Sequence, residues 1–144
     1  MFDLKSKIIL ITGGAGLLGS RLAEVILSNN GIPVILDNNT KKISRLKKKF
    51  KNNNSIEFYK VDISNKKQIK DTINRIHKKL KKIDCLINNA GYNPILGSKN
   101  NKFENFSIEQ WNKEIQIGLT GSLVVTQEVV KKMIKQKNGN IINI

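Results

Sequence analysis

The sequence predicts an α/β protein in which a doubly wound parallel sheet lies between two layers of helices. Two observations predict this fold. Short apolar runs of strand length alternate with longer segments whose apolar residues recur at helical spacing, a pattern typical of parallel strands joined by helices. A cluster of glycines follows the first apolar run, where a strand would turn sharply into a helix. The 144 residues, 39% of them hydrophobic, are enough for one domain with a buried core.

Strand-like and helix-like segments alternate along the whole chain, and this pattern predicts the position of each strand and helix. We expect strands at residues 7–12, 33–37, 56–61, 83–89 and 140–144. We expect helices at residues 17–29, 40–50, 65–81 and 107–135. The last helix begins with Ser107-Ile-Glu-Gln110, a capping-box pattern. We predict the strand order 3-2-1-4-5, with a ligand crevice at the carboxyl ends of the first and fourth strands. A polar loop at residues 92–106 follows the fourth strand at this edge, where long loops tend to carry function.

The glycine cluster indicates a phosphate site. Gly13, Gly16 and Gly19 directly follow the apolar strand that ends at Thr12. Because glycine has no Cβ, main-chain N–H groups there can approach a pyrophosphate at the positive end of the next helix. Asp37 lies at the end of the second strand, 24 residues after Gly13. An acid that hydrogen-bonds a ribose hydroxyl is expected about 20 residues after such a glycine turn. The pattern predicts dinucleotide binding, and the alternative is a coincidental glycine-rich turn.

Charge and hydropathy narrow the classes of partner. The formal net charge is +15, and only Arg21, Arg45 and Arg75 among the 26 basic residues are arginine. Phosphate and base recognition usually draws on the guanidinium group, so we expect a solvated lysine surface and no nucleic-acid partner.

The longest apolar run, Ile8 to Ile11, is far shorter than the ~20 residues of a membrane span. Since the N-terminus also lacks a signal-peptide layout, we expect a cytoplasmic protein with no membrane partner.

Cys85 and His77 are each expected to have a structural and not a catalytic role. Cys85 lies within an apolar run and is expected to be a small core residue. His77 stands among lysines on a helix, and we expect an exposed residue without a catalytic role. Because no cluster of cysteine and histidine occurs, we expect no metal.

Two further motifs follow strands. Asp62 ends the third strand, where it can cap the next helix or accept a hydrogen bond from an adenine amino group. Asn88-Asn89-Ala90-Gly91 follows the fourth strand and places two small residues after a polar one. That order leaves space for a nicotinamide-side ribose to pass close to the backbone.

Taken together, these motifs resemble the short-chain dehydrogenase/reductase family over essentially the whole chain. The resemblance implies an NAD(P)-binding Rossmann fold and hydride transfer between the nicotinamide cofactor and a small-molecule carbonyl or alcohol. It implies that the glycine turn holds pyrophosphate and that Asp37 selects NAD over NADP. It also implies that Asp62 and Ile63 line the adenine pocket, and that Asn89 to Gly91 line the nicotinamide ribose. The implied cofactor-binding residues are Thr12, Gly13, Gly16, Leu17, Leu18, Gly19, Asp37, Asp62, Ile63, Asn89, Ala90 and Gly91.

The chain departs from the family pattern in three places. Its glycine spacing matches the extended, sugar-nucleotide-modifying branch, whereas Asn88 to Gly91 match the compact branch. Gly118 stands where the compact branch has an asparagine in its long helix. Residues 139–144 match the fifth strand, after which the family carries its catalytic Ser and a Tyr-x-x-x-Lys pair.

This chain contains none of the family's catalytic Ser, Tyr and Lys residues. The resemblance therefore implies that residues 1–144 are the N-terminal cofactor-binding domain, incomplete at the C-terminus and inactive alone, with no catalytic residue. The full-length protein is expected to be a homo-oligomer. The alternatives are a sugar-nucleotide epimerase or dehydratase relative and a non-catalytic dinucleotide-binding module.

Overall fold

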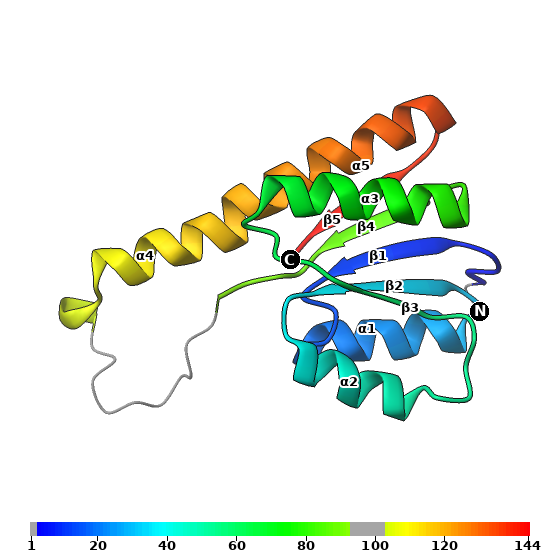
Figure 1. The fold of residues 1–144 in the computed structure, drawn as a ribbon, viewed down its shortest axis with the longest axis horizontal. Coiled ribbons are helices and arrows are strands. Elements are labelled where there is room, and N and C mark those ends of the chain that lie inside the picture. The colour runs from blue at the N-terminus through cyan, green and yellow to red at the C-terminus, as the bar shows by residue number, and fades with distance from the viewer. Residues whose placement is uncertain (1–2, 93–102) are drawn as a thin grey trace.

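A computed structural model describes residues 3–92 and 103–144. Five parallel strands form one sheet in the order β3-β2-β1-β4-β5, as predicted (Figure 1). The strands are β1 (Ile8–Thr12), β2 (Ile32–Asp37), β3 (Glu57–Lys60), β4 (Cys85–Asn88) and β5 (Asn140–Asn143). The strand order reverses between β1 and β4, so their carboxyl ends diverge into a crevice where ligands bind in doubly wound sheets.

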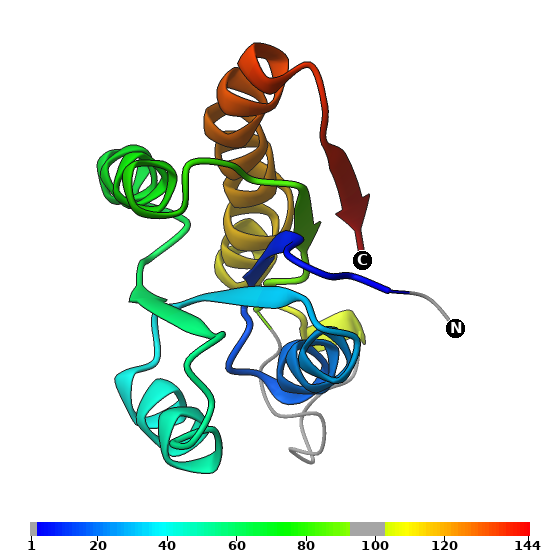
Figure 2. The same ribbon diagram turned by 90° about the vertical axis from the view of Figure 1, so that its right-hand side faces the viewer.

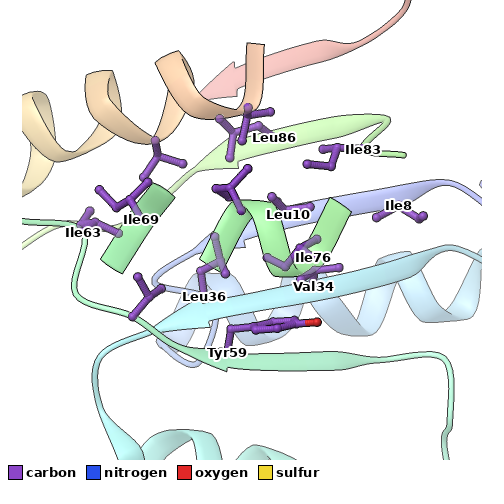
Figure 3. Close-up of a cluster of buried hydrophobic side chains, with 14 of the residues drawn as sticks. Ile8, Leu10, Val34, Leu36, Tyr59, Ile63, Ile69, Ile76, Ile83 and Leu86 are labelled. Atoms are coloured by element: carbon purple, nitrogen blue, oxygen red, sulfur yellow. The ribbon is translucent and has the colours of Figure 1, made fainter. Parts of the chain in front are cut away.

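Helices cover both faces of the sheet (Figure 2). One face carries α1 (Leu17–Ser28) and α2 (Thr40–Lys49), and the other carries α3 (Lys66–Leu80) and α5 (Ser122–Gln136). Figure 3 shows the core between the sheet and α3, where Leu10, Leu86 and Ile76 are fully buried. These layers confirm the predicted α/β class, and none of the helices within the described ranges is long and apolar enough to cross a membrane.

Asparagine or serine side chains cap three of the described helices, and of these caps the sequence predicted only Ser107. The side chain of Asn39 accepts a hydrogen bond from the Lys42 N–H, and that of Asn65 accepts one from the Gln68 N–H. Ser107 caps α4 (Ile108–Glu114) by accepting from the N–H of Gln110. Such caps satisfy N–H groups that have no partner within the helix.

The long helix predicted at residues 107–135 is helical throughout but not uniformly an α-helix. A π-helical segment, η2 (Ile115–Gly121), joins α4 to α5. Gly121 lies against the core here, because a Cβ added to it would be 3.0 Å from Ile63 Cδ1. Most of the predicted loop at residues 92–106 lies outside the described residues, apart from Tyr92 and the stretch that begins with the 3₁₀ helix η1 (Phe103–Asn105).

Candidate functional site

Three loops meet at the carboxyl edge of the sheet. The glycine turn follows β1, Asp37 ends β2, and Asn89 to Gly91 follow β4. Because all the strands are parallel, these segments lie together although they are far apart in the sequence. The fold therefore assembles most of the predicted site residues at one place.

The glycine turn packs against the loop after β4. Gly13 has φ +62°, a conformation that residues with a side chain rarely adopt, and its added Cβ would lie 2.9 Å from Ala90 Cα. A Cβ at Gly19 would lie 2.5 Å from the Gly13 oxygen, so only glycine lets α1 rest on the turn. Both positions therefore require glycine, because a side chain at either one would clash with neighbouring backbone atoms.

The N-terminus of α1 is left open by the turn. Its N-cap is Gly16, which has no side chain to bond the first N–H groups, and its first turn carries no acidic residue. These groups form the positive end of the helix dipole and favour an anion. Leu17 and Leu18 lie in this first turn with 87% and 48% of their surface exposed.

Asp37 ties the glycine turn to β2. Its Oδ2 accepts a hydrogen bond from the Ala15 N–H at 3.0 Å, and its Oδ1 accepts from the Asn39 N–H at 2.9 Å. The residue is 9% exposed. Each carboxylate oxygen can accept a second bond, so the same group can anchor the turn and still receive ribose hydroxyls.

Thr12 joins the ends of β1 and β4. It is fully buried, and its Oγ1 accepts hydrogen bonds from the N–H groups of Asn89 and Ala90, both at 3.0 Å. The Asn89 side chain makes a further bond to the same residue, since its Nδ2 donates to the Thr12 carbonyl oxygen at 3.0 Å. These two polar side chains hold the loops in place. By contrast, a Cβ at Gly91 would meet no atom of the described residues within 4 Å, so their side of the backbone is open to a ligand.

Asp62 makes a local turn contact before α3 and does not cap this helix, whose N-cap is Asn65. Its Oδ1 accepts hydrogen bonds from the N–H and the hydroxyl of Ser64, at 2.9 and 2.7 Å. Ile63 is 7% exposed and belongs to the core beneath α3. The structure thus gives both residues a role in forming the turn before α3.

Asn88 is a polar residue whose role sequence reasoning missed. It is 3% exposed, and its Nδ2 donates to Thr126 Oγ1 at 3.0 Å and to Asn143 Oδ1 at 2.8 Å. These bonds connect β4 to α5 and β5. The only signal in the sequence was a polar pair directly after an apolar strand.

The reactive side chains lie away from the three loops. Cys85 is half-buried and packs against the core beneath α1, and burial and the nearby Asp84 raise the pKa of its thiol. His77 is half-buried rather than exposed, in the last turn of α3, and burial lowers its pKa. Within the described residues, no three histidine, cysteine or acidic side chains gather into a metal-binding group.

The family of the chain follows from a comparison with protein-family models. The model described as short chain dehydrogenase matches residues 7–144. The chain belongs to this family. The glycine turn, Asp37 and Asn89 to Gly91, which carried the resemblance in the sequence, all lie within the matched residues.

Named relatives give the extent of the match. The 3-oxoacyl-(acyl-carrier-protein) reductase FabG of Buchnera aphidicola is 34% identical over 138 residues, which are 96% of this chain and 54% of that protein. The structure of ElxO with NADP bound has a TM-score of 0.84 and 29% identity, over 96% of this chain and 54% of that one. NAD⁺-bound xylitol dehydrogenase has a TM-score of 0.86 over 99% of this chain and 54% of its own, and at 23% identity it shows the fold alone. The chain spans about half the length of these relatives.

Proposed function

We propose that this chain binds a nicotinamide dinucleotide and is the cofactor-binding part of a short-chain dehydrogenase. The reaction proposed for the whole protein is hydride transfer between the cofactor and a small-molecule carbonyl or alcohol. The observation that carries the proposal is the open N-terminus of α1 behind a turn that Asp37 and Ala90 hold in place. The relative at 34% identity is a 3-oxoacyl-(acyl-carrier-protein) reductase, which favours this reaction over the sugar-nucleotide alternative.

Each predicted residue has a proposed part in holding the cofactor. The backbone of Gly13, Gly16, Leu17, Leu18 and Gly19 would receive the pyrophosphate, because the free N–H groups of the helix end lie there. Asp62 and Ile63 would border the adenine, and Ala90 and Gly91 would let the nicotinamide ribose approach the backbone. Thr12 and Asn89 would act by fixing the two loops. The cofactor, when bound, supplies the hydride chemistry.

We propose NAD in preference to NADP. The Asp37 carboxylate can accept ribose hydroxyls and would repel a 2′-phosphate. The exposed Lys41 and Lys42 in the first turn of α2 would favour NADP instead, because an ammonium group can also bind a phosphate.

Calorimetric titration of the 144-residue chain with NAD⁺, NADH, NADP⁺ and NADPH tests the binding proposal. We expect saturable binding with NAD forms tighter than NADP forms. Gly19→Ala should weaken binding because its Cβ would contact the Gly13 oxygen. Gly118→Ala, whose Cβ would contact none of the described residues within 4 Å, should not. Circular dichroism of both variants checks that they are folded. Absence of binding by the folded wild-type chain would refute the proposal.

We also propose that this chain alone does not turn over substrate. Reduction of a carbonyl needs a positioned proton donor, which contributes about 10²–10⁴-fold to the rate. The sequence offers no tyrosine followed by lysine at the family spacing, since Tyr59 and Tyr92 precede Ile63 and Leu96. Oxidation of NADH should therefore stay at background with a panel of carbonyl compounds. Robust turnover free of contaminating enzyme would contradict this.

Finally, we propose that the full-length protein self-associates through its longest helical segment. One side of this segment exposes apolar residues, which are Ile108, Trp111, Ile115, Leu119 and Leu123. Contiguous apolar surface of this kind favours a partner surface. We expect Leu119→Glu to lower the oligomer mass measured by sedimentation, with the exposed polar Gln116→Glu as the control.

A further inference from the structure

The edge of the sheet formed by β3 is open. Among residues 3–92 and 103–144, β3 pairs only with β2, in a parallel ladder in which the Val61 N–H donates to the Asp37 oxygen at 2.9 Å. Main-chain groups of a strand point alternately to its two sides. The N–H and C=O groups of Phe58 and Lys60 therefore point away from β2 toward the open edge.

A hollow lies beside this edge, between β3 and the second half of α3. Its volume is about 580 Å³, and it is lined by Glu57, Phe58, Tyr59, Arg75, Lys78 and Lys79. Figure 1 shows β3 as the outermost strand, and Figure 2 shows α3 on one side of it. Unpaired backbone groups and a hollow of this size thus lie side by side.

The hollow carries an excess of positive charge. Its single carboxylate, Glu57, is paired with Lys79 at 2.6 Å. Arg75 and Lys78 form no ion pair with the residues that the structure describes. The Arg75 guanidinium lies over the ring of Tyr59, 5.7 Å from its centroid, and the residue is exposed to solvent. The surface therefore complements carboxylates.

We propose that this hollow binds an extended acidic segment of another protein, which adds to β3 as a sixth strand. The segment would pair with the main chain of Phe58 and Lys60, as in strand addition to an exposed edge. Acidic side chains at alternate positions of the added strand would face Arg75 and Lys78. The proposal is independent of the dinucleotide site, because α3 runs away from the carboxyl edge of the sheet and Arg75 to Lys79 lie in its second half.

Charge and ring exposure argue against other occupants. A second copy paired through β3 would bring two positively charged hollows together. Single-stranded RNA binds through aromatic faces on which bases stack, but Tyr59 is 9% exposed beneath Arg75, and Lys47 lies over the Phe58 ring. An acidic peptide strand needs neither ring face.

Fluorescence anisotropy with a labelled peptide of alternating Glu and Val tests the proposal on the 144-residue chain. We expect binding that weakens by about tenfold in Arg75→Glu/Lys78→Glu, since each lost surface pair contributes up to about 1 kcal/mol. Lys67→Glu/Lys70→Glu makes the same charge change at the same spacing on α3, outside the hollow, and should bind nearly as wild type. Lys78→Glu alone replaces the double variant if circular dichroism shows the latter unfolded. Equal losses in the test and control pairs would overturn the proposal.

Amide hydrogen exchange by NMR tests the geometry of binding. The peptide should slow exchange at Phe58 and Lys60, whose N–H groups face the open edge, and leave Tyr59 unchanged. Uniform or absent slowing along β3 would overturn strand addition. Displacement of the peptide by equimolar oligouridylate, with greater affinity for the RNA, would instead assign the surface to nucleic acid.

Discussion

The main-chain N–H of Ala90 donates to the Thr12 hydroxyl oxygen at 3.0 Å, across the point where the strand order reverses. The N–H of Asn89 donates to the same oxygen. Because Thr12 is fully buried, water cannot take the place of its hydroxyl. One side chain therefore holds together two of the three loops at the candidate cofactor site, those that follow β1 and β4.

Replacing Thr12 by valine should destabilise the fold while keeping its shape. The substitution leaves two N–H donors without an acceptor, and an unsatisfied buried donor costs about 1–3 kcal/mol. We expect the free energy of unfolding in urea to fall by about 2 kcal/mol or more. Thr12→Ser keeps the hydroxyl and should lose much less. Equal stability of the valine and serine variants would show that the two bonds contribute nothing.

Gly13→Ala should damage the site more than Gly91→Ala, although both change a glycine in the same crevice. Alanine at Gly13 would have to adopt φ +62° and place its Cβ 2.9 Å from Ala90 Cα. A left-handed conformation alone costs about 1–2 kcal/mol. A Cβ at Gly91 would meet nothing within 4 Å among the residues that the structure describes. Thermal melts and cofactor titrations of both variants measure the difference, and equal effects would contradict the close approach at Gly13.

The fold was predictable because its signals are local. Strand and helix periods are repeated in order along the chain, and parallel strands joined by helices allow few arrangements. The predicted strand order and layers are confirmed, with boundaries shifted by one or two residues, as at β4, which begins at Cys85 and not at residue 83. The clustering of Gly13, Asp37 and Ala90 follows from this order, because each lies at or just beyond the carboxyl end of a strand.

The contacts that stabilise the site were not predictable from local patterns. The bonds of Thr12 to Asn89 span 77 residues, and those of Asn88 to Asn143 span 55. The pattern identified both threonine and asparagine as polar residues at strand ends, but their hydrogen-bond partners depend on the register of β1, β4 and β5. The π-helical segment was also missed, because a single wide turn leaves the apolar spacing of Ile115 and Leu119 unchanged.

Asp37→Ala should shift the cofactor preference toward NADP. The variant loses the carboxylate that would repel a 2′-phosphate, while Lys41 and Lys42 remain nearby. We expect NAD affinity to fall and the ratio of NADP to NAD affinity to rise. Adding Lys41→Ala/Lys42→Ala should reverse the gain for NADP. Titration with both cofactors measures these ratios, and an unchanged ratio in Asp37→Ala would remove this residue from cofactor selection.

Acid should weaken the packing of α3 on α5 through His77. Burial lowers the pKa of His77 below its ordinary value of 6.5, and Lys132, Lys135 and Lys81 lower that pKa further. The unfolded chain then binds a proton more readily than the folded one, so this contribution to stability is complete above pH 6.5 and is lost as the pH falls through the folded pKa.

The charge of His77 can be isolated with His77→Gln. Urea unfolding of the wild type should show a loss of stability between pH 7.5 and pH 5 that is smaller in the glutamine variant. The Hε1 resonance of His77 should titrate below that of a free histidine. Parallel pH dependence in the two proteins would assign the loss to the carboxylates instead.

The outer strand β5 should make the 144-residue chain self-associate. Within the part of the chain that the structure describes, β5 pairs only with β4. All four of its residues are exposed, with Ile141 at 37% and Ile142 at 48%. An apolar edge with unpaired backbone groups is a template for strand pairing, and a lysine on such an edge opposes it. We expect Ile142→Lys to lower light scattering at high protein concentration. Asn54→Lys adds the same charge to an exposed loop far from β5 and should scatter as wild type. If both lysine variants reduced scattering equally, net charge and not the β5 edge would govern association.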